Sequence, residues 1–199
     1  MGPVGFDLDM TLIDSRQATL ASFAAMAEET GTAVDLAAVD SRLGIKLEDE
    51  LLFWYPPDQQ AGAAVIFRRH YVRLARQLTA VLPGALEALA TVRAAGQRVV
   101  IITAKHPISV QPSLEATGIT ADKVYTFVHG SEKAAVLRRE GAAVYVGDSP
   151  PDVAAAVSAN VRAVGVATGS FSRADLARAG ADVVLDSLTA FPAWYHGQH

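Results

Sequence analysis

The stretch from Arg98 to Val146 reads RVVIITAKHPISVQPSLEATGITADKVYTFVHGSEKAAVLRREGAAVYV. It contains three short runs rich in apolar and β-branched residues, at 98–103, 123–128 and 142–146, with helical stretches between them. Each run is continuous and not alternating, which is typical of strands covered on both faces in a parallel sheet. Strands that alternate with helices of this length predict a doubly wound α/β fold.

The same alternation extends in both directions from this stretch. Further apolar runs and helical stretches lie at Val4–Leu8, 85–95, 150–160, 163–166, 173–179 and 182–185. We therefore expect residues 1–14 and 82–199 to form a Rossmann-like core, built on a parallel sheet with helices on both faces. The last residues, 194–199, are expected to fray.

The segment between the first strand and the helix at 85–95 breaks the alternation. It contains no convincing strand and is interpreted as helices at 17–30, 35–43, 46–54 and 58–80. Within the last of these, apolar residues recur at spacings of four and three, which predicts one buried stripe. Residues 15–81 are therefore predicted to be an inserted, all-helical cap domain.

Composition excludes several classes of protein. The chain has 199 residues, 51% of them hydrophobic, which suits a compact fold and excludes intrinsic disorder. It has no cysteine, which excludes disulfides and thiolate chemistry, and its net charge of −4 argues against binding nucleic acid. No apolar run is long enough to cross a bilayer and no targeting segment is visible, so we expect a cytoplasmic protein without a membrane partner.

Polar side chains gather where the predicted strands end. In doubly wound sheets, ligands bind outside the carboxyl ends of the strands. The residues at or near these ends include Asp7, Asp9, Thr11, Thr103, Lys105, Lys133, Asp148 and Asp152. Carboxylates this close repel one another and need a cation between them, and Mg²⁺ with oxygen ligands fits best.

Four motifs stand in order on these elements. They are DLDMT at 7–11, a hydroxyl at Thr103, Lys133, and GDSPPD at 147–152. Together they resemble the haloacid dehalogenase-like hydrolase superfamily, in particular its phosphoglycolate-phosphatase-like members with a helical cap. The resemblance implies a Mg²⁺-dependent phosphatase that hydrolyses a small-metabolite phosphate monoester through an aspartyl-phosphate. The partner implied is a small phosphorylated metabolite, and the chain would act as a monomer or homodimer.

The resemblance also implies roles for individual residues. Asp7 would be the nucleophile, and Asp9 the general acid and base. Mg²⁺ would be bound by the carboxylates of Asp7 and Asp148 and by the backbone carbonyl of Asp9. The substrate-binding group would comprise Thr11, which orders the loop around Asp7, and Thr103, the N–H of Ala104 and Lys133, which contact the phosphate. Ser149 and Asp152 would act from outside the direct metal ligands, Asp152 by supporting the metal or by orienting Lys133.

Alternative interpretations stay open at several positions. Asp148 and Ser149 could also cap the helix at 150–160. Lys105 and His106 share a loop and either contact substrate or are ordinary exposed residues. Met10 stands where the family usually has glycine, so the turn after Asp9 must accommodate a side chain.

Three other functions compete with the phosphatase hypothesis. A sugar-phosphate mutase shares the chemistry of the two N-terminal aspartates and returns the phosphoryl group to the sugar. A phospho-receiver module carries similar residues on such a sheet, but it lacks the helical insertion. A silent binding protein would lack the nucleophile or the acid. The aspartate at position 9 favours a phosphate ester as substrate, because the carbon–halogen and phosphonate branches of the family carry another residue there.

Overall fold

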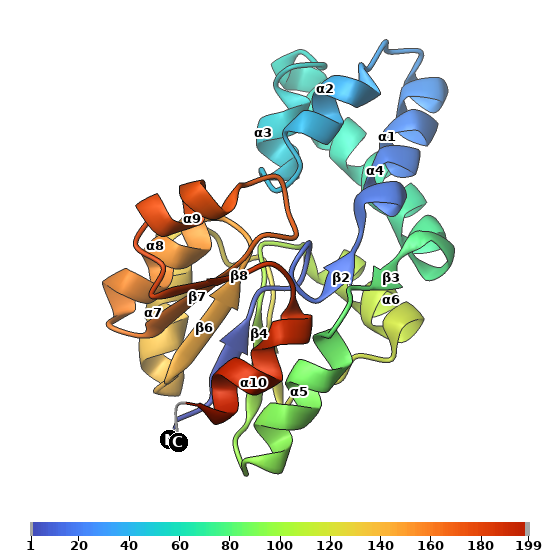
Figure 1. Ribbon diagram of the computed structural model, residues 1–199. Helices are drawn as coiled ribbons and strands as arrows, with labels where there is room; N and C mark the ends of the chain where they lie inside the picture. Colours follow the sequence, from blue (N-terminus) through green and yellow to red (C-terminus); the bar gives the residue numbers. More distant parts are fainter. Residues whose placement is uncertain (1, 198–199) are drawn as a thin grey trace. The chain divides into compact units, whose positions relative to one another are not determined.

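The computed structural model of the chain describes residues 2–197, which group into two compact units (Figure 1). One unit contains residues 2–14, 81–105 and 119–197, and the other contains residues 15–80 and 106–118. Across residues 2–197 no helix combines the length and the apolar character that crossing a membrane requires.

The first unit is built on a six-stranded parallel sheet with the order β5-β4-β1-β6-β7-β8. The strands are β1 (Val4–Phe6), β4 (Val99–Ile102), β5 (Lys123–Tyr125), β6 (Val144–Gly147), β7 (Arg162–Val166) and β8 (Val183–Leu185). β1 lies in the interior of the sheet, where Val4 is paired with Val99 on one side and with Val144 on the other. The predicted doubly wound α/β fold is confirmed.

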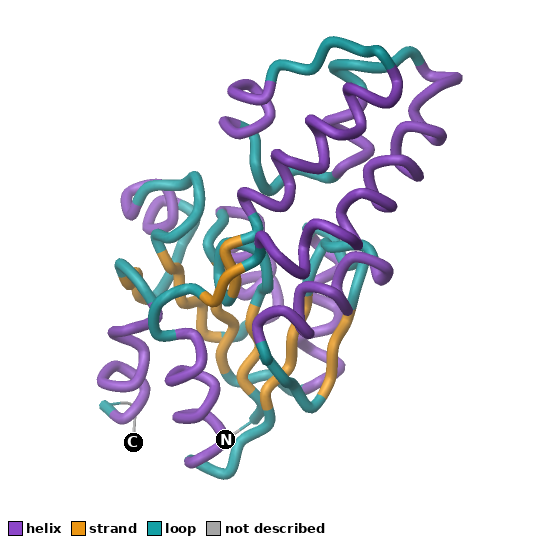
Figure 2. The backbone as a smooth tube through the Cα atoms, turned by 90° about the vertical axis from the view of Figure 1, so that its right-hand side faces the viewer, coloured by secondary structure: helices purple, strands orange, loops and turns teal. Residues whose placement is uncertain are grey.

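Helices cover both faces of this sheet (Figures 1 and 2). One face carries α7 (Ser131–Glu140), α8 (Pro150–Ala159) and α9 (Arg173–Arg178), and the other carries α5 (Ala85–Ala94), the short 3₁₀ turn η1 (Leu188–Ala190) and α10 (Phe191–His196). Successive residues of β1 face the helices on opposite sides of the sheet. Phe6 contacts Phe191 with ring centroids 5.6 Å apart, whereas a Cβ at Gly5 would lie 2.9 Å from Tyr145 on the opposite face.

Two expectations about the ends of elements are wrong. The strand predicted at 123–128 ends at Tyr125, and it is an exposed edge strand, so its outer positions are not covered on both faces. The C-terminal residues expected to fray form α10 as far as His196, where Tyr195 is buried and stacks on Phe191 at 5.4 Å. Burial of these two rings stabilises the end of the chain. Residues 198–199 lie outside the described part.

The longer elements of the second unit are all helices. It contains α1 (Arg16–Thr30), α2 (Leu36–Ser41), α3 (Leu47–Leu51), α4 (Pro57–Leu78) and α6 (Pro107–Thr117). The apolar stripe predicted for the longest helix forms part of its core, where the rings of Phe23 and Phe67 are 4.7 Å apart. Two-residue strands β2 (Ile13–Asp14) and β3 (Ala80–Val81) pair where the chain passes between the units.

The grouping differs from the predicted domain boundaries at residues 106–118. The sequence places this segment in the core, whereas the structure groups α6 with the helical unit. The reason is packing against α4, where the hydroxyl of Tyr71 lies 3.3 Å from that of Ser113 in a buried contact. An amphipathic pattern shows that a helix has a buried face but does not identify the partner of that face.

Candidate active site

The predicted site residues converge at the topological switch point of the sheet. The chain winds outward from β1 through β4 to β5 and then continues on the other side of β1 with β6, β7 and β8. Asp7 directly follows β1, Asp148 follows β6, and Thr103 follows β4. The N–H of Asp7 donates to the carbonyl of Val146 at 2.8 Å, so the nucleophile candidate still belongs to the hydrogen-bonded ladder. A side chain held in this way is well positioned for chemistry.

A buried lysine joins two of the aspartates. Lys133 lies in the first turn of α7, and its Nζ donates to Asp7 Oδ1 at 2.7 Å and to Asp152 Oδ1 at 2.6 Å. All three side chains are at least nine-tenths covered. The predicted lysine and the two aspartates are therefore brought together, and Asp152 contacts Lys133 directly. A buried ammonium with two carboxylate partners is fixed in position and in charge.

Asp152 is itself held by two hydroxyl groups. Ser149 donates to Asp152 Oδ2 at 2.5 Å, and the hydroxyl of Tyr145 lies 3.1 Å from Asp152 Oδ1 and 3.0 Å from the carbonyl of Ile102. Ser149 is at the N-cap position of α8, but its side chain makes no capping hydrogen bond. Tyr145 is not among the site residues predicted from sequence. Its only signal is a tyrosine within an otherwise aliphatic strand.

Asp148 is positioned by Thr11 and by the loop after β7. The hydroxyl of Thr11 donates to Asp148 Oδ1 at 3.2 Å, and Thr11 is fully buried. Gly169 approaches so closely that a Cβ there would lie 1.9 Å from Asp148 Oδ2. On the same loop, the hydroxyl of Thr168 donates to the carbonyl of Met10 at 2.5 Å. The resemblance implied that Thr11 orders the loop around Asp7, whereas the printed contact of its hydroxyl is with Asp148. The sequence contained no signal for the contacts of residues 168–169.

Burial and crowding raise the pKa of two aspartates. Burial, together with repulsion from Asp152 and Asp9, raises the pKa of Asp7 from 3.8 to about 7, although Lys133 opposes the shift. Burial, with repulsion from Asp152 and Asp7, also raises the pKa of Asp148 well above its ordinary value. Burial disfavours the charge on Lys133, but the carboxylates of Asp152 and Asp7 outweigh it and hold the pKa of Lys133 well above the ordinary value. The three aspartates and Lys133 therefore contain more negative than positive charge.

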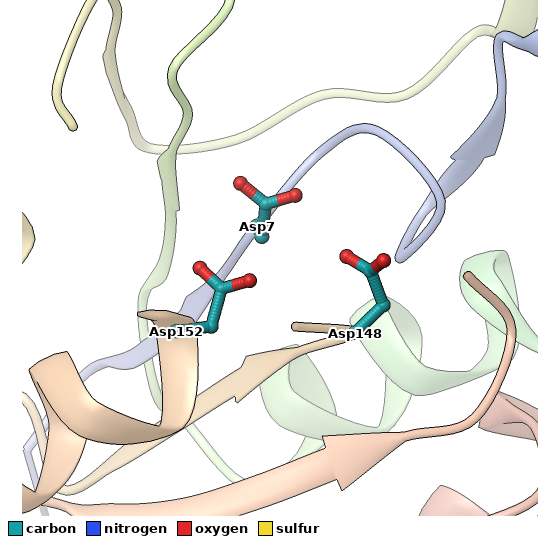
Figure 3. Close-up of side chains that lie close together, drawn as sticks. All are labelled: Asp7, Asp148 and Asp152. Atoms are coloured by element: carbon teal, nitrogen blue, oxygen red, sulfur yellow. The ribbon is translucent and has the colours of Figure 1, made fainter. Parts of the chain in front are cut away.

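The same three aspartates form a potential metal site. Asp7, Asp148 and Asp152 each offer a carboxylate oxygen, and these oxygens lie within 4.8 Å of one another. Figure 3 shows the three carboxylates directed toward a common space from the end of β1, the end of β6 and the start of α8. Three carboxylates against the single charge of Lys133 leave an excess of two negative charges, which a divalent cation with oxygen ligands would neutralise. The residues therefore fit the metal that the family resemblance implies.

Asp9 lies apart from this group. Its side chain is 27% exposed, and its Oδ1 accepts a hydrogen bond from Lys105 Nζ at 2.5 Å. The side chain of Lys105 is only 9% exposed, so Lys105 forms a partly buried ion pair where the sequence left a choice between a substrate contact and an exposed loop residue. The three converging carboxylates are those of Asp7, Asp148 and Asp152. The predicted metal ligands were the carboxylates of Asp7 and Asp148 and the backbone carbonyl of Asp9, so Asp152 is an addition to the prediction.

Thr103 is buried and Ala104 follows it at the end of β4. The Thr103 hydroxyl oxygen accepts a hydrogen bond from the N–H of Lys105 at 3.1 Å. This bond uses the oxygen as an acceptor, so the hydroxyl hydrogen can still donate to a phosphate oxygen. The geometry is compatible with the predicted phosphate contact.

Comparison with known proteins defines the class of this chain. The family described as haloacid dehalogenase-like hydrolase matches residues 4–166. A phosphoglycolate phosphatase of Rhodospirillum rubrum is 31% identical over 87% of this chain and 68% of its own length. A plasmid-borne phosphoglycolate phosphatase of Cupriavidus necator is 29% identical over 94% of this chain and 90% of its own length. A haloacid dehalogenase-like hydrolase structure from Streptococcus pneumoniae has a TM-score of 0.84 at 21% identity and covers 98% of each chain.

The chain therefore belongs to the haloacid dehalogenase-like hydrolase family, in the branch that contains phosphoglycolate phosphatases. The predicted family and the predicted enzyme class, a phosphoric monoester hydrolase, are confirmed.

Proposed function

We propose that this enzyme hydrolyses the phosphate monoester of a small metabolite through an aspartyl-phosphate on Asp7, with Asp9 as general acid and base and Mg²⁺ as cofactor. One observation carries the proposal. Asp7 lies at the end of the interior strand β1, paired with Lys133 inside a buried group of three carboxylates. This arrangement combines a nucleophile with an environment that attracts a cation and a phosphoryl group.

Each residue has a defined part in the proposed reaction. A carboxylate oxygen of Asp7 forms a bond to phosphorus while the bond from phosphorus to the ester oxygen breaks. Asp9 gives its proton to that leaving oxygen and becomes a carboxylate. Asp9 then accepts a proton from the water that attacks the phosphorus, which releases inorganic phosphate and restores both aspartates. Lys133, Thr103 and the N–H of Ala104 would hold the phosphate oxygens in place.

Asp7 and Asp148 would hold the metal ion by their carboxylates, with the backbone carbonyl of Asp9. When bound, Mg²⁺ offsets negative charge on the phosphoryl group. In this proposal Thr11 orients Asp148, while Ser149 and Asp152 keep Lys133 in place, as their hydrogen bonds and ion pairs indicate.

The substrate is proposed from the relatives and from the helical unit. Phosphoglycolate is the first candidate, because two curated relatives are named for it. We propose that the helical unit acts as a cap that selects the leaving group. The expectations of a cytoplasmic location and of a monomer or homodimer, without nucleic acid or membrane partners, are kept as parts of this proposal.

The test is a phosphate-release assay with Mg²⁺ across a panel of small phosphate esters, including phosphoglycolate and a sugar phosphate. Free phosphate supports the hydrolase, whereas an isomerised sugar phosphate without free phosphate indicates the mutase. Acid quenching during turnover should trap one phosphoryl group on Asp7, which peptide mass spectrometry can locate. A protein that binds Mg²⁺ and phosphate but forms neither product would refute the proposal.

A further inference from the structure

A second lysine, Lys105, occupies the catalytic edge of the sheet together with Lys133. Lys133 contacts Asp7 and Asp152, whereas Lys105 contacts Asp9, so the two lysines pair with different aspartates. The positive charge of Lys105 is balanced by the carboxylate of Asp9, with which it forms an ion pair. The three-carboxylate group therefore keeps its deficit of positive charge whether or not Lys105 is present.

The backbone of Lys105 is held at two points. Its N–H donates to the hydroxyl of Thr103 at 3.1 Å, and its carbonyl accepts from the N–H of Phe127 at 3.0 Å. Phe127 has a φ of 58°, a left-handed conformation that is costly for an aromatic residue. Strain of this kind persists where surrounding structure enforces it, and it clusters at functional sites.

The side chain of Lys105 is also confined. With 9% of it exposed, its methylene groups are packed, and its ammonium is 2.5 Å from Asp9 Oδ1. A lysine that only served solubility would extend its ammonium into water. The ammonium of Lys105 instead contacts Oδ1 of Asp9, because the backbone of Lys105 is held in place and its side chain is mostly covered.

We propose that Lys105 is a positioning residue for Asp9: it holds Oδ1, so that the orientation of the carboxyl group is fixed and Oδ2 exchanges the proton with the leaving oxygen. This inference rests on the proposed function, in which Asp9 protonates that oxygen. Loss of this contact would remove one restraint on the orientation of the carboxyl group, and small errors in the position of a proton donor reduce the rate of transfer.

The experiment compares two substrates that differ in their need for an acid. An alkyl phosphate, glycerol 1-phosphate, requires protonation of its leaving oxygen, whereas 4-nitrophenyl phosphate departs as a stable phenolate. Lys105→Met keeps the length of the side chain and removes the ammonium. We expect kcat/KM to fall about 100-fold for the alkyl ester and less than about 5-fold for the aryl ester, in the range attributed to general acids. Asp9→Asn should show the same selectivity.

Two further variants make the result decisive. Lys123→Met removes another lysine–carboxylate pair of the same unit, and it should leave both substrates unchanged. Lys105→Arg retains a donor for Asp9 and should recover part of the alkyl-ester activity. Should Lys105→Met fail to fold by circular dichroism, Lys105→Leu, which also offers Asp9 no hydrogen-bond donor, gives the same comparison.

An equal loss on both substrates, or no loss on either, would overturn the role of Lys105 while leaving the phosphatase proposal standing. An unmodified enzyme that releases no phosphate with Mg²⁺ from any ester of the panel, phosphoglycolate included, is a different result, because it would overturn the proposed function itself.

Discussion

The two ends of the parallel sheet each contain a largely buried carboxylate, and the surroundings shift the pKa values of these two groups in opposite directions. At the amino ends of the strands, Glu140 is 4% exposed and receives contacts from Lys123 at 2.8 Å and Arg98 at 3.2 Å, with a further hydrogen bond from Tyr125. These partners lower the pKa of Glu140 to about 2. At the carboxyl ends, burial and repulsion raise the pKa of Asp7 to about 7.

The difference lies in the balance of charge. The single negative charge of Glu140 has two cationic partners and a hydroxyl donor, so it is neutralised within the protein and stabilises the fold. The group around Asp7 has three carboxylates for one buried lysine. Such an arrangement costs stability and persists where an external cation or substrate compensates for it. Lys123, which pairs with Glu140 at 2.8 Å, belongs to this structural end.

The largest effect should come from replacing Asp7, the proposed nucleophile. Asp7→Asn keeps the shape of the side chain, and we expect phosphate release to fall by roughly 10⁴-fold or more, because no aspartyl-phosphate can form. Its melting temperature should not fall, since the substitution removes a carboxylate that burial disfavours. Glu140→Gln, at the other end, should retain activity and lose about 1–2 kcal/mol of stability. An active Asp7→Asn enzyme would remove the basis of the comparison.

Mg²⁺ should distinguish the two ends next. A cation that binds only the folded state at 100 times its dissociation constant adds about 2.7 kcal/mol, or about 5–10 °C in melting temperature for a chain of this size. Asp148→Asn should remove most of this shift, because it removes one of the three converging carboxylates. Glu140→Gln should keep it. Differential scanning fluorimetry with EDTA and with Mg²⁺ measures both, and an unchanged shift in Asp148→Asn would contradict the metal assignment.

The pH dependence of stability should also have opposite signs at the two ends. Without divalent cations, folded Asp7 keeps its proton to about pH 7, whereas the unfolded carboxyl loses it near 3.8. The folded state binds more protons in this window, so its contribution to stability falls as pH rises from about 4 to 7. Glu140 has a folded pKa of about 2 and an ordinary value of 4.5, so its stabilisation is present above 4.5 and is lost as pH falls toward 2.

Thermal melts in EDTA between pH 2.5 and 8 would separate these contributions. Asp7→Asn should weaken the decline between about pH 4 and 7, with Asp148 still contributing in the same direction. Glu140→Gln should weaken the decline below about pH 4.5. Identical slopes for Asp7→Asn and the unmodified protein in the upper window would show that the carboxyl of Asp7 is not destabilised by its surroundings.

A glycine packed against Asp148 should matter for activity, whereas a glycine in open space should not. Gly169→Ala would place a Cβ 1.9 Å from Asp148 Oδ2, so Asp148 or its loop must move. We expect about a 100-fold loss of activity, since a displacement of about 1 Å can cost that much. Gly62→Ala on α4 meets nothing within 4 Å and should add about 0.5–1 kcal/mol of stability. Normal kinetics of Gly169→Ala would show that the position of Asp148 is not critical.

The fold and the meeting of Asp7 and Asp148 at one edge of the sheet could be predicted, because both follow from local sequence. A continuous apolar run predicts a buried parallel strand, and a carboxylate that follows it must lie at the carboxyl edge. The contacts of Tyr145, Gly169 and α6 could not be predicted in this way. They depend on which surfaces meet after folding, and an apolar stripe or a glycine does not specify its neighbour. Lys105 was on the expected loop, but its burial and its partner are tertiary properties.

The smallest effect concerns the residue that departs from the family pattern. Met10 adopts a φ of 58°, the left-handed conformation that glycine adopts without strain. Its roles in the loop are those of its backbone, since its N–H donates to Ile13 and its carbonyl accepts from Thr168. Relief of about 1–2 kcal/mol of strain in Met10→Gly is offset by about 0.4–1 kcal/mol of added flexibility in the unfolded chain.

The net gain for Met10→Gly should be about 0.5 kcal/mol, or about 1–2 °C in melting temperature, with kcat/KM unchanged. Calorimetry of the two proteins side by side resolves a difference of this size. A lower melting temperature would mean that the methionine side chain contributes packing worth more than the strain. The catalytic end would then contain a side-chain contribution from Met10 that the charge comparison with Glu140 does not include.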